Sequence, residues 1–196
     1  MSDIEQVVSQ RLRMVKSVIE DVGGIPPSGF EIAFGRCESP IEQAYCLTIF
    51  QVPWVFAVPG DFHAGLLADL PPCTKPRIFV FAQQPIPPYR ADFLLLGLSP
   101  NQAEPRFIIV ECDGSAYHSS RDQVHRDSQR ESALIRTGFK VVRFTGTMIY
   151  HEPQTVVRRS LEPFVGFDAR ARARGVNGWM LRQAFKQLRD WAPQFT

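Results

Sequence analysis

Residues 106–118, RFIIVECDGSAYH, decide the fold that we expect for this chain. Their first half is almost continuously apolar and rich in β-branched residues, which is typical of a buried central strand. Side chains alternate between the two faces of a strand, so Glu111 and Asp113 share one face while Cys112 points to the other. We therefore expect a sheet whose central strand ends in two carboxylates.

The preceding strand brings a third carboxylate to the same place. YRADFLLLG, residues 89–97, is a strand candidate that carries Asp92 between two apolar side chains. An antiparallel hairpin about the 99–104 turn would place Leu98 opposite Pro105 and Asp92 opposite Glu111. Asp92, Glu111 and Asp113 would then gather at the end of a buried strand.

Carboxylates on apolar strands need a partner, because burying an isolated charge is costly. A divalent cation is the simplest partner, and Mg²⁺ binds through one or two carboxylates together with water and substrate phosphates. The spacing thus predicts a metal site for phosphodiester chemistry. In the alternative interpretation, Asp92 and Asp113 merely end their strands, and Asp113-Gly114 forms a turn.

Glu42 has two interpretations as well. Ser39 and Pro40 have the sequence signature of a helix start, and this helix should run to about Phe50. Glu42, three residues after Ser39, completes a capping box, which alone would explain it. In the sharper interpretation it is a fourth acidic ligand that reaches the site from a neighbouring helix.

The remaining pattern predicts an α/β fold with a central mixed sheet flanked by helices. Residues 53–76 are expected to be an irregular insertion because this part of the chain is rich in proline. Further strands are predicted over 77–82 and 139–144, and further helices over 3–21, 120–137, 153–164 and 178–191.

The segment after the acidic strand adds polar candidates. His118 follows Asp113 by five residues, and the next helix carries Asp127 and Arg130 on one side. These two form an intrahelical pair, or Asp127 orients His118 while Arg126 or Arg130 meets a phosphate. A soft-metal site from Cys112, His118 and His125 is disfavoured, because Cys112 faces away from Glu111.

The composition of the chain excludes several classes of protein. The chain of 196 residues has 44% hydrophobic and 21% charged residues, which excludes a disordered or disulfide-stapled protein. Residues 158–189 contain eight Lys or Arg and two acidic residues, a footprint for nucleic acid or simply a solvated helical face. Neither a signal peptide nor a membrane span is evident, so we expect a cytoplasmic protein with reduced cysteines.

Four segments, read in order, resemble a known family: CESPIE, AQQPIPPYRADFLL, FIIVECDGSAYH and RDSQRESALIRTGFKVVRF. Together they are similar to the PD-(D/E)XK nuclease superfamily, in particular to small domains of unknown function related to the very-short-patch repair endonucleases. The signature is a strand acid, E-x-D-G-x-x-x-H, D-x-x-R on a helix and a G-[FY]-x-V-x-R-F strand. The resemblance covers roughly residues 36–150.

The resemblance implies a restriction-endonuclease-like core over residues 36–150, with a helix and linker over 1–35 and a basic helical extension over 151–196. It makes Asp92 and Glu111 the metal-binding acids and Glu42 the acid of the first core helix. Asp113 stands where the superfamily has lysine, so water activation would need the metal, Asp113 or His118. Residues expected to contact nucleic acid or support the site are Gln84, Arg126, Asp127, Arg130 and Arg143.

The expected function is therefore a Mg²⁺- or Mn²⁺-dependent DNA endonuclease, with the backbone carbonyl of Cys112 helping Asp92 and Glu111 to hold the metal. The zinc site of the repair endonucleases has no counterpart here, so mismatch repair does not follow. The alternatives are a non-catalytic module that binds nucleic acid or protein, and an enzyme that acts on RNA. A cutter of both strands would need a homodimer or a recognition partner.

Overall fold

The structure is a computed structural model. It describes residues 29–69, 74–100, 104–114, 134–136, 139–164 and 168–191, together with residues 10, 12, 13, 16, 17, 20 and 166. Most of the predicted helices over 3–21 and 120–137 lies outside these residues, and the residues of both ranges that are described are helical.

The centre of the fold is a five-stranded mixed sheet in the order β1-β2-β3-β4-β5. Neighbours β2, β3 and β4 are antiparallel, whereas β1 runs parallel to β2 and β5 parallel to β4. The strands are β1 (Val55–Ala57), β2 (Arg77–Ile86), β3 (Tyr89–Leu98), β4 (Arg106–Asp113) and β5 (Lys140–Thr145). The predicted α/β class and its mixed sheet are confirmed.

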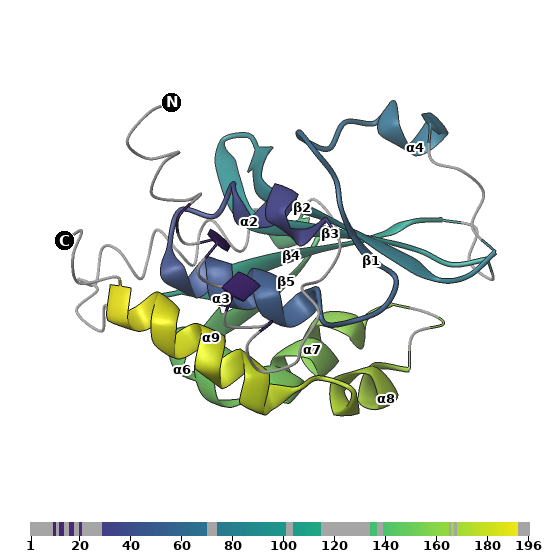
Figure 1. Ribbon diagram of the computed structural model, residues 1–196. Coiled ribbons are helices and arrows are strands. Elements are labelled where there is room, and N and C mark those ends of the chain that lie inside the picture. Colours follow the sequence, from purple (N-terminus) through teal and green to yellow (C-terminus); the bar gives the residue numbers. More distant parts are fainter. Residues whose placement is uncertain are drawn as a thin grey trace.

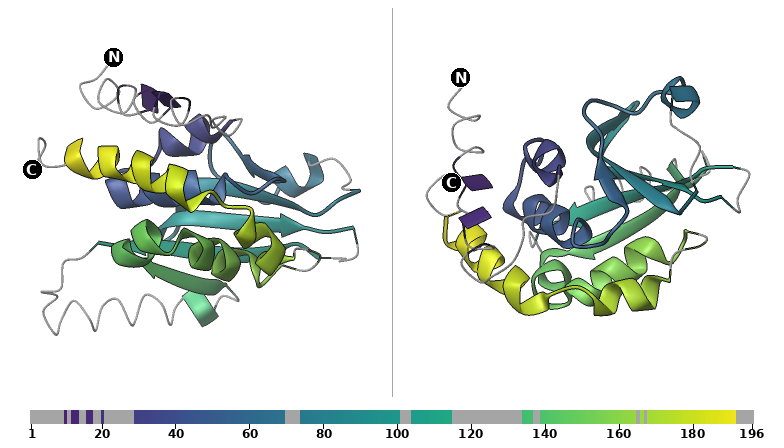
Figure 2. Two further views of the ribbon diagram at one scale, coloured as in Figure 1. Left: turned by 60° about the horizontal axis from the view of Figure 1, so that its bottom comes forward. Right: turned by 45° about the vertical axis from the view of Figure 1, so that its right-hand side comes forward.

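Helices cover one face of this sheet (Figures 1 and 2). Here α3 (Pro40–Ile49) packs against β4 and against α6 (Gly146–His151), α7 (Pro153–Leu161) and α9 (Gly178–Trp191). The buried side chains of this face form one cluster that includes Tyr45 of α3 and Phe93 of β3, whose ring centroids are 4.8 Å apart. This face holds the larger part of the hydrophobic core.

The opposite face of the sheet carries a second, smaller cluster. It includes Phe81 of β2, Leu94 and Leu96 of β3, and Ile109 of β4. Alternate residues of β2 and β4 go to the two clusters, as the period of a strand requires. The nearly continuous apolar run of residues 107–110 reflects this burial on both faces.

The structure contains elements that the sequence did not predict. The proline-rich stretch 53–76, expected to be irregular, contains β1 and the short helix α4 (Leu66–Asp69), and α2 (Phe30–Phe34) buries two phenylalanines. Helix α8 (Ala169–Arg174) is also new, and it follows α7. No helix in the described part of the chain is both long and apolar enough to cross a bilayer.

The C-terminal helices belong to the core. Val156 and Leu161 of α7 and Leu181 and Phe185 of α9 are buried in the same cluster as α3. The last helices, expected from the sequence to be additions to the nuclease-like core, thus pack into the hydrophobic core of the described chain, and their apolar stripes complete the cover of the sheet.

Candidate active site

The β3–β4 ladder ends where the predicted acids begin. Strand pairing runs from Gly97 opposite Arg106 to Phe93 opposite Val110, which is the predicted register. Beyond this point β3 stays paired with β2 as far as Ile86 and Tyr89. The β2–β3 hairpin thus continues past its last pairing with β4, and Asp92 is the first residue beyond that point.

Asp92 is held against the end of β4. Its Oδ2 accepts a hydrogen bond of 2.7 Å from the backbone N–H of Cys112. A carboxylate that accepts a backbone N–H is fixed in direction, because the donor belongs to a strand and cannot rotate away. This bond brings the acid of β3 to the E-x-D segment of β4, as the sequence predicted.

Glu111 and Asp113 lie on β4 beside Arg143 of β5. Glu111 is only 5% exposed and stands opposite Arg143 in the parallel register. Asp113 is half-exposed, and its Oδ1 is 3.6 Å from a terminal guanidinium nitrogen of Arg143. Arg143, predicted to contact nucleic acid, therefore lies next to an acid of the site.

Glu42 approaches from the start of α3 and does cap this helix. Ser39 Oγ accepts the Glu42 N–H, and the Ser39 hydroxyl and the Glu38 N–H donate to the Glu42 carboxylate at 2.7 and 2.8 Å. Burial raises the pKa of Glu42, as does the negative charge of Asp92, although its hydrogen bonds oppose the shift. The capping interpretation is confirmed, and the Asp92 effect shows that Glu42 also lies near the strand acids.

Cys112 lies among these carboxylates. Burial raises the pKa of its thiol well above the ordinary value, and four negative charges raise it further: those of Asp92, Glu42, Glu111 and Asp113. Burial and these charges act together against the thiolate form of Cys112. The charges of all four acids therefore act on this one thiol.

Gln83 is a site residue that the sequence analysis missed. It falls opposite Asp92 in the β2–β3 register, at the only position left out of that described ladder, and its φ of 55° is left-handed. Its Nε2 donates to Glu42 Oε2 at 2.7 Å. Its Oε1 is buried and has no hydrogen-bond partner in the described part of the chain.

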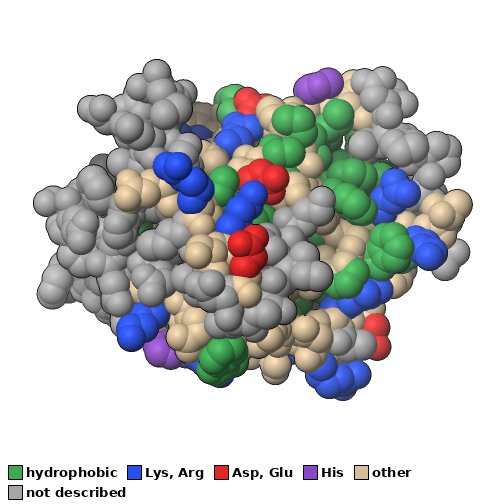
Figure 3. Space-filling model, in the orientation of Figure 1, with side chains coloured by type: hydrophobic (Ala, Val, Ile, Leu, Met, Phe, Trp, Pro, Cys, Tyr) green, Lys and Arg blue, Asp and Glu red, His purple; other side chains and the backbone are tan. Residues whose placement is uncertain are grey.

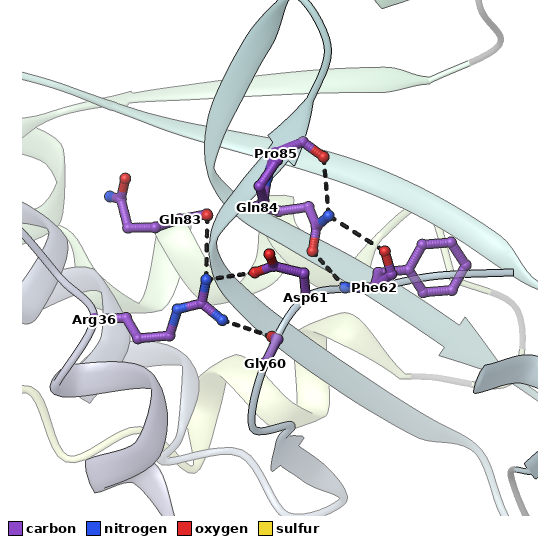
Figure 4. Close-up of polar contacts among 7 residues, drawn as sticks. All are labelled: Arg36, Gly60, Asp61, Phe62, Gln83, Gln84 and Pro85. Carbon is purple, nitrogen blue, oxygen red and sulfur yellow. Dashed lines mark hydrogen bonds and ion pairs between the residues drawn. The ribbon is translucent and has the colours of Figure 1, made fainter. Parts of the chain in front are cut away.

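The neighbouring Gln84 does not face the acids. It is 4% exposed, and its Oε1 accepts the Phe62 N–H at 2.6 Å while its Nε2 donates to the carbonyls of Phe62 and Pro85 (Figure 4). Arg36 fixes the same loop through the Gly60 carbonyl and Asp61. The side chain of Gln84, predicted to contact nucleic acid, is thus occupied in holding a loop.

A pocket of about 360 Å³ lies between α3, α6 and α9. Its wall includes Ile41, next to Glu42, and Gly146, next to the last residue of β5. Three residues that carry or can acquire positive charge line it as well: His151, Arg182 and Lys186. The basic C-terminal helix therefore contributes to the surface near the acidic site.

The family comparison agrees with this geometry. A restriction-endonuclease-like family model, REase_MTES_1575, matches residues 77–163. The matched range includes Asp92, Glu111, Asp113 and Arg143 and excludes Glu42. No curated protein and no solved structure matches the chain significantly.

The match supports a nuclease-like domain. It suggests a nuclease-type function and agrees with the restriction-endonuclease-like fold class. It covers β2 to β5 together with α6 and α7, and so includes β3 and β4, which carry the strand acids. Helix α9 and its basic residues lie outside the match.

The donor chemistry of this nuclease-like site fits a hard divalent cation. Asp92, Glu111 and Asp113 offer carboxylate oxygens, the ligands that Mg²⁺ prefers. The buried Gln83 Oε1 without a described partner adds an oxygen beside Glu42. Among the described residues, however, no three His, Cys, Asp or Glu side chains form a ready metal-binding group.

Four residues predicted for the site lie outside the described residues. They are His118, Arg126, Arg130 and Asp127, the residue proposed to orient His118. Their assignments stay predictions from the sequence.

Proposed function

We propose that this nuclease-like domain is a metal-dependent DNA endonuclease. The observation that carries the proposal is the hydrogen bond between Asp92 and the backbone of Cys112, which joins the acid of β3 to the E-x-D segment of β4. Carboxylates at a buried strand end are costly unless hydrogen bonds or positive groups offset them, and a cation is one such positive group. The proposal assigns that role to Mg²⁺, with Mn²⁺ as a substitute.

Asp92 and Glu111 would hold the cation, together with the backbone carbonyl of Cys112. When bound, such a cation polarises a phosphoryl oxygen and lowers the pKa of a coordinated water. Glu42, whose carboxylate is already bonded to Ser39 and the Glu38 N–H, orients the site through Gln83. Asp92 is oriented in turn by the fixed N–H of Cys112.

Asp113 takes the position of the lysine that the wider superfamily uses. We assign it as the group that accepts a proton from the attacking water, because it is half-exposed and belongs to the same strand end as Glu111. The Arg143 guanidinium, 3.6 Å from the Asp113 Oδ1, would offer a further donor to a phosphate oxygen. His118 is the alternative proton acceptor.

The pocket beside Ile41 supports a path for the DNA backbone. Arg182 and Lys186 of α9 are exposed on its wall. Cations that are not in contact with the acids would attract phosphate without neutralising the metal ligands. Cutting both strands of a duplex would require a second copy of the chain or a recognition partner.

One observation favours a second candidate, a non-catalytic binding module on the same fold. The described residues contain no ready group of three metal ligands. Under this alternative the carboxylates would only cap the ends of their strands, and the basic helices would carry the binding function.

A cleavage assay separates the two candidates. Supercoiled plasmid and single-stranded DNA are incubated with the protein in Mg²⁺, Mn²⁺ or EDTA, using wild type, Asp92→Asn and Glu162→Ala. Glu162 is an exposed acid in a surface pair with Arg158 and serves as the matched control. The nuclease predicts metal-dependent cleavage that D92N abolishes and E162A retains. Cleavage by D92N at the wild-type rate would contradict the assigned site, and a folded wild type that cleaves neither DNA would favour the binding module.

A further inference from the structure

The β1 edge of the sheet carries two exposed aromatic side chains. Trp54 is 37% exposed and Phe56 is 39% exposed, while Val55 between them is buried in the core. In the described part of the chain β1 pairs only with β2, so its outer edge faces away from the sheet. Large aromatic side chains grouped on a surface are uncommon unless they bind something.

Basic side chains lie against both rings. Lys75 Nζ is 4.9 Å from the centroid of the Trp54 ring, and the guanidinium carbon of Arg77 is 5.9 Å from that of Phe56. No acidic side chain among the described residues forms an ion pair with either cation. Figure 3 shows hydrophobic and basic side chains next to one another on the right-hand side of the molecule, around β1.

The rings are held in place rather than loosely attached. Trp54 has a left-handed φ of 76°, and its carbonyl accepts the Ile78 N–H of β2 at 2.9 Å. The Phe56 ring rests on Phe79, with centroids 5.9 Å apart and planes inclined by 33°. A non-glycine residue held in this backbone region is strained, and such strain is concentrated at functional positions.

We propose that single-stranded nucleic acid binds along this edge, with bases stacked on Trp54 and Phe56 and phosphates beside Lys75 and Arg77. Aromatic faces with nearby cations bind unpaired bases of any sequence, whereas the bases of a duplex are already stacked on one another. The inference rests on the proposed nuclease function and deepens it, because it names a single-stranded segment as the substrate class.

The same strand connects this edge to the acids. Six residues of β2 separate Arg77 from Gln83, which is about 20 Å at the rise of a strand. A stacked strand of roughly six nucleotides covers that length at 3.4 Å per step. Because residues 78–84 of β2 are buried, a strand that joins the rings to the carboxylates would pass over the surface above them and would need at least this length.

Binding is measured by fluorescence anisotropy in EDTA, so that cleavage plays no part. The probes are labelled 15-nucleotide oligo-dT, oligo-rU and a 15-base-pair DNA duplex, and the two single strands distinguish DNA from RNA. The variants are W54A, F56A and K75A, and W54F retains a ring. W179A is an aromatic comparison on α9, where Trp179 is 54% exposed, and a loss of affinity in this variant would show that the basic helix rather than the β1 edge holds the bases. Circular dichroism and urea unfolding verify that each variant is folded.

Loss of one stacking ring should weaken single-strand binding on the order of tenfold. We expect this for W54A and F56A, a smaller loss for K75A, and near wild-type affinity for W54F and W179A. Wild-type affinity in folded W54A and F56A would overturn the inference, as would an equal loss with the duplex. If W54A does not fold, the affinities of F56A and K75A test the inference, and wild-type affinity in both would overturn it.

Failure of the single-strand site can be told apart from failure of the proposed nuclease function. Binding that depends on Trp54 in a protein without metal-dependent cleavage would retain the single-strand site and overturn the nuclease. Cleavage that depends on Asp92, in a protein whose single-strand affinity is unchanged by W54A and F56A, would retain the nuclease and overturn the single-strand site. Failure of the wild type to bind either single strand overturns the inference whatever the cleavage result.

Discussion

The two parts of β3 differ in their strand pairing and in the groups that surround their side chains. From Phe93 to Gly97 the strand is fully paired with β4, and its side chains are divided between two hydrophobic clusters. At Asp92 the pairing with β4 stops, a carboxylate accepts the N–H of the next strand, and Gln83 opposite it is left-handed. The part of β3 that pairs with β4 contributes to the hydrophobic core and so to stability. The end beyond that pairing contributes polar groups that the stability of the fold does not require.

The largest expected difference in the free energy of unfolding is between variants at two neighbouring residues of β3. Phe93→Ala removes a fully buried ring and should lower the free energy of unfolding by about 3–5 kcal/mol. Asp92→Asn keeps an oxygen that accepts the Cys112 N–H, so its change should stay within about 1 kcal/mol. Urea unfolding of both variants measures the difference, and equal losses would contradict the division of β3 into two parts.

A second pair, Gln84 and Gln83, sharpens the comparison. Gln84→Leu leaves the part-buried Phe62 N–H and carbonyl without their partner and should cost about 1–2 kcal/mol. Gln83→Leu breaks one bond to Glu42 but also removes a buried oxygen that has no described partner, so it should cost less than about 1 kcal/mol. Thermal and urea unfolding test this order. A larger loss for Q83L than for Q84L would show that Gln83 has a structural role.

The smallest effect concerns Glu42 and depends on pH. Burial raises the pKa of Glu42, so the folded protein binds its proton more tightly than the unfolded chain does. The stability from this proton is present below the unfolded pKa and is lost as the pH rises through the raised pKa. Glu42→Gln does not titrate, and its amide can donate to the Ser39 hydroxyl. Its stability relative to wild type should therefore increase between pH 4 and pH 7, and a difference that does not change with pH would contradict the shift.

The sequence predicted the regular parts of this site well. The apolar run of β4, the turn before it and the Ser39-Pro40 cap each follow a local rule, and together they determined the β3–β4 register and the start of α3. These features depend on neighbours in the sequence or on simple alternation, and both can be read without a structure.

The irregular parts could not be read in the same way. Strict alternation after Ala82 would turn Gln83 away from α3, but its left-handed backbone directs it to Glu42. Ala91 and Phe93, two residues apart, likewise belong to different clusters. Extending the hairpin register to Asp92 would have identified Gln83 as its partner. The three-residue β1 had no alternating pattern long enough to reveal it.

The central claim is that the acids at the end of β3 and β4 bind a divalent cation. Electron paramagnetic resonance of Mn²⁺, titrated into wild type, Asp92→Asn, Glu111→Gln and the control Glu162→Ala with a short oligonucleotide present, tests it directly. The account predicts bound Mn²⁺ in wild type and E162A, competition by Mg²⁺, and loss of binding in D92N and E111Q. Mn²⁺ binding that is the same in all four folded proteins, or absent from wild type, would contradict it.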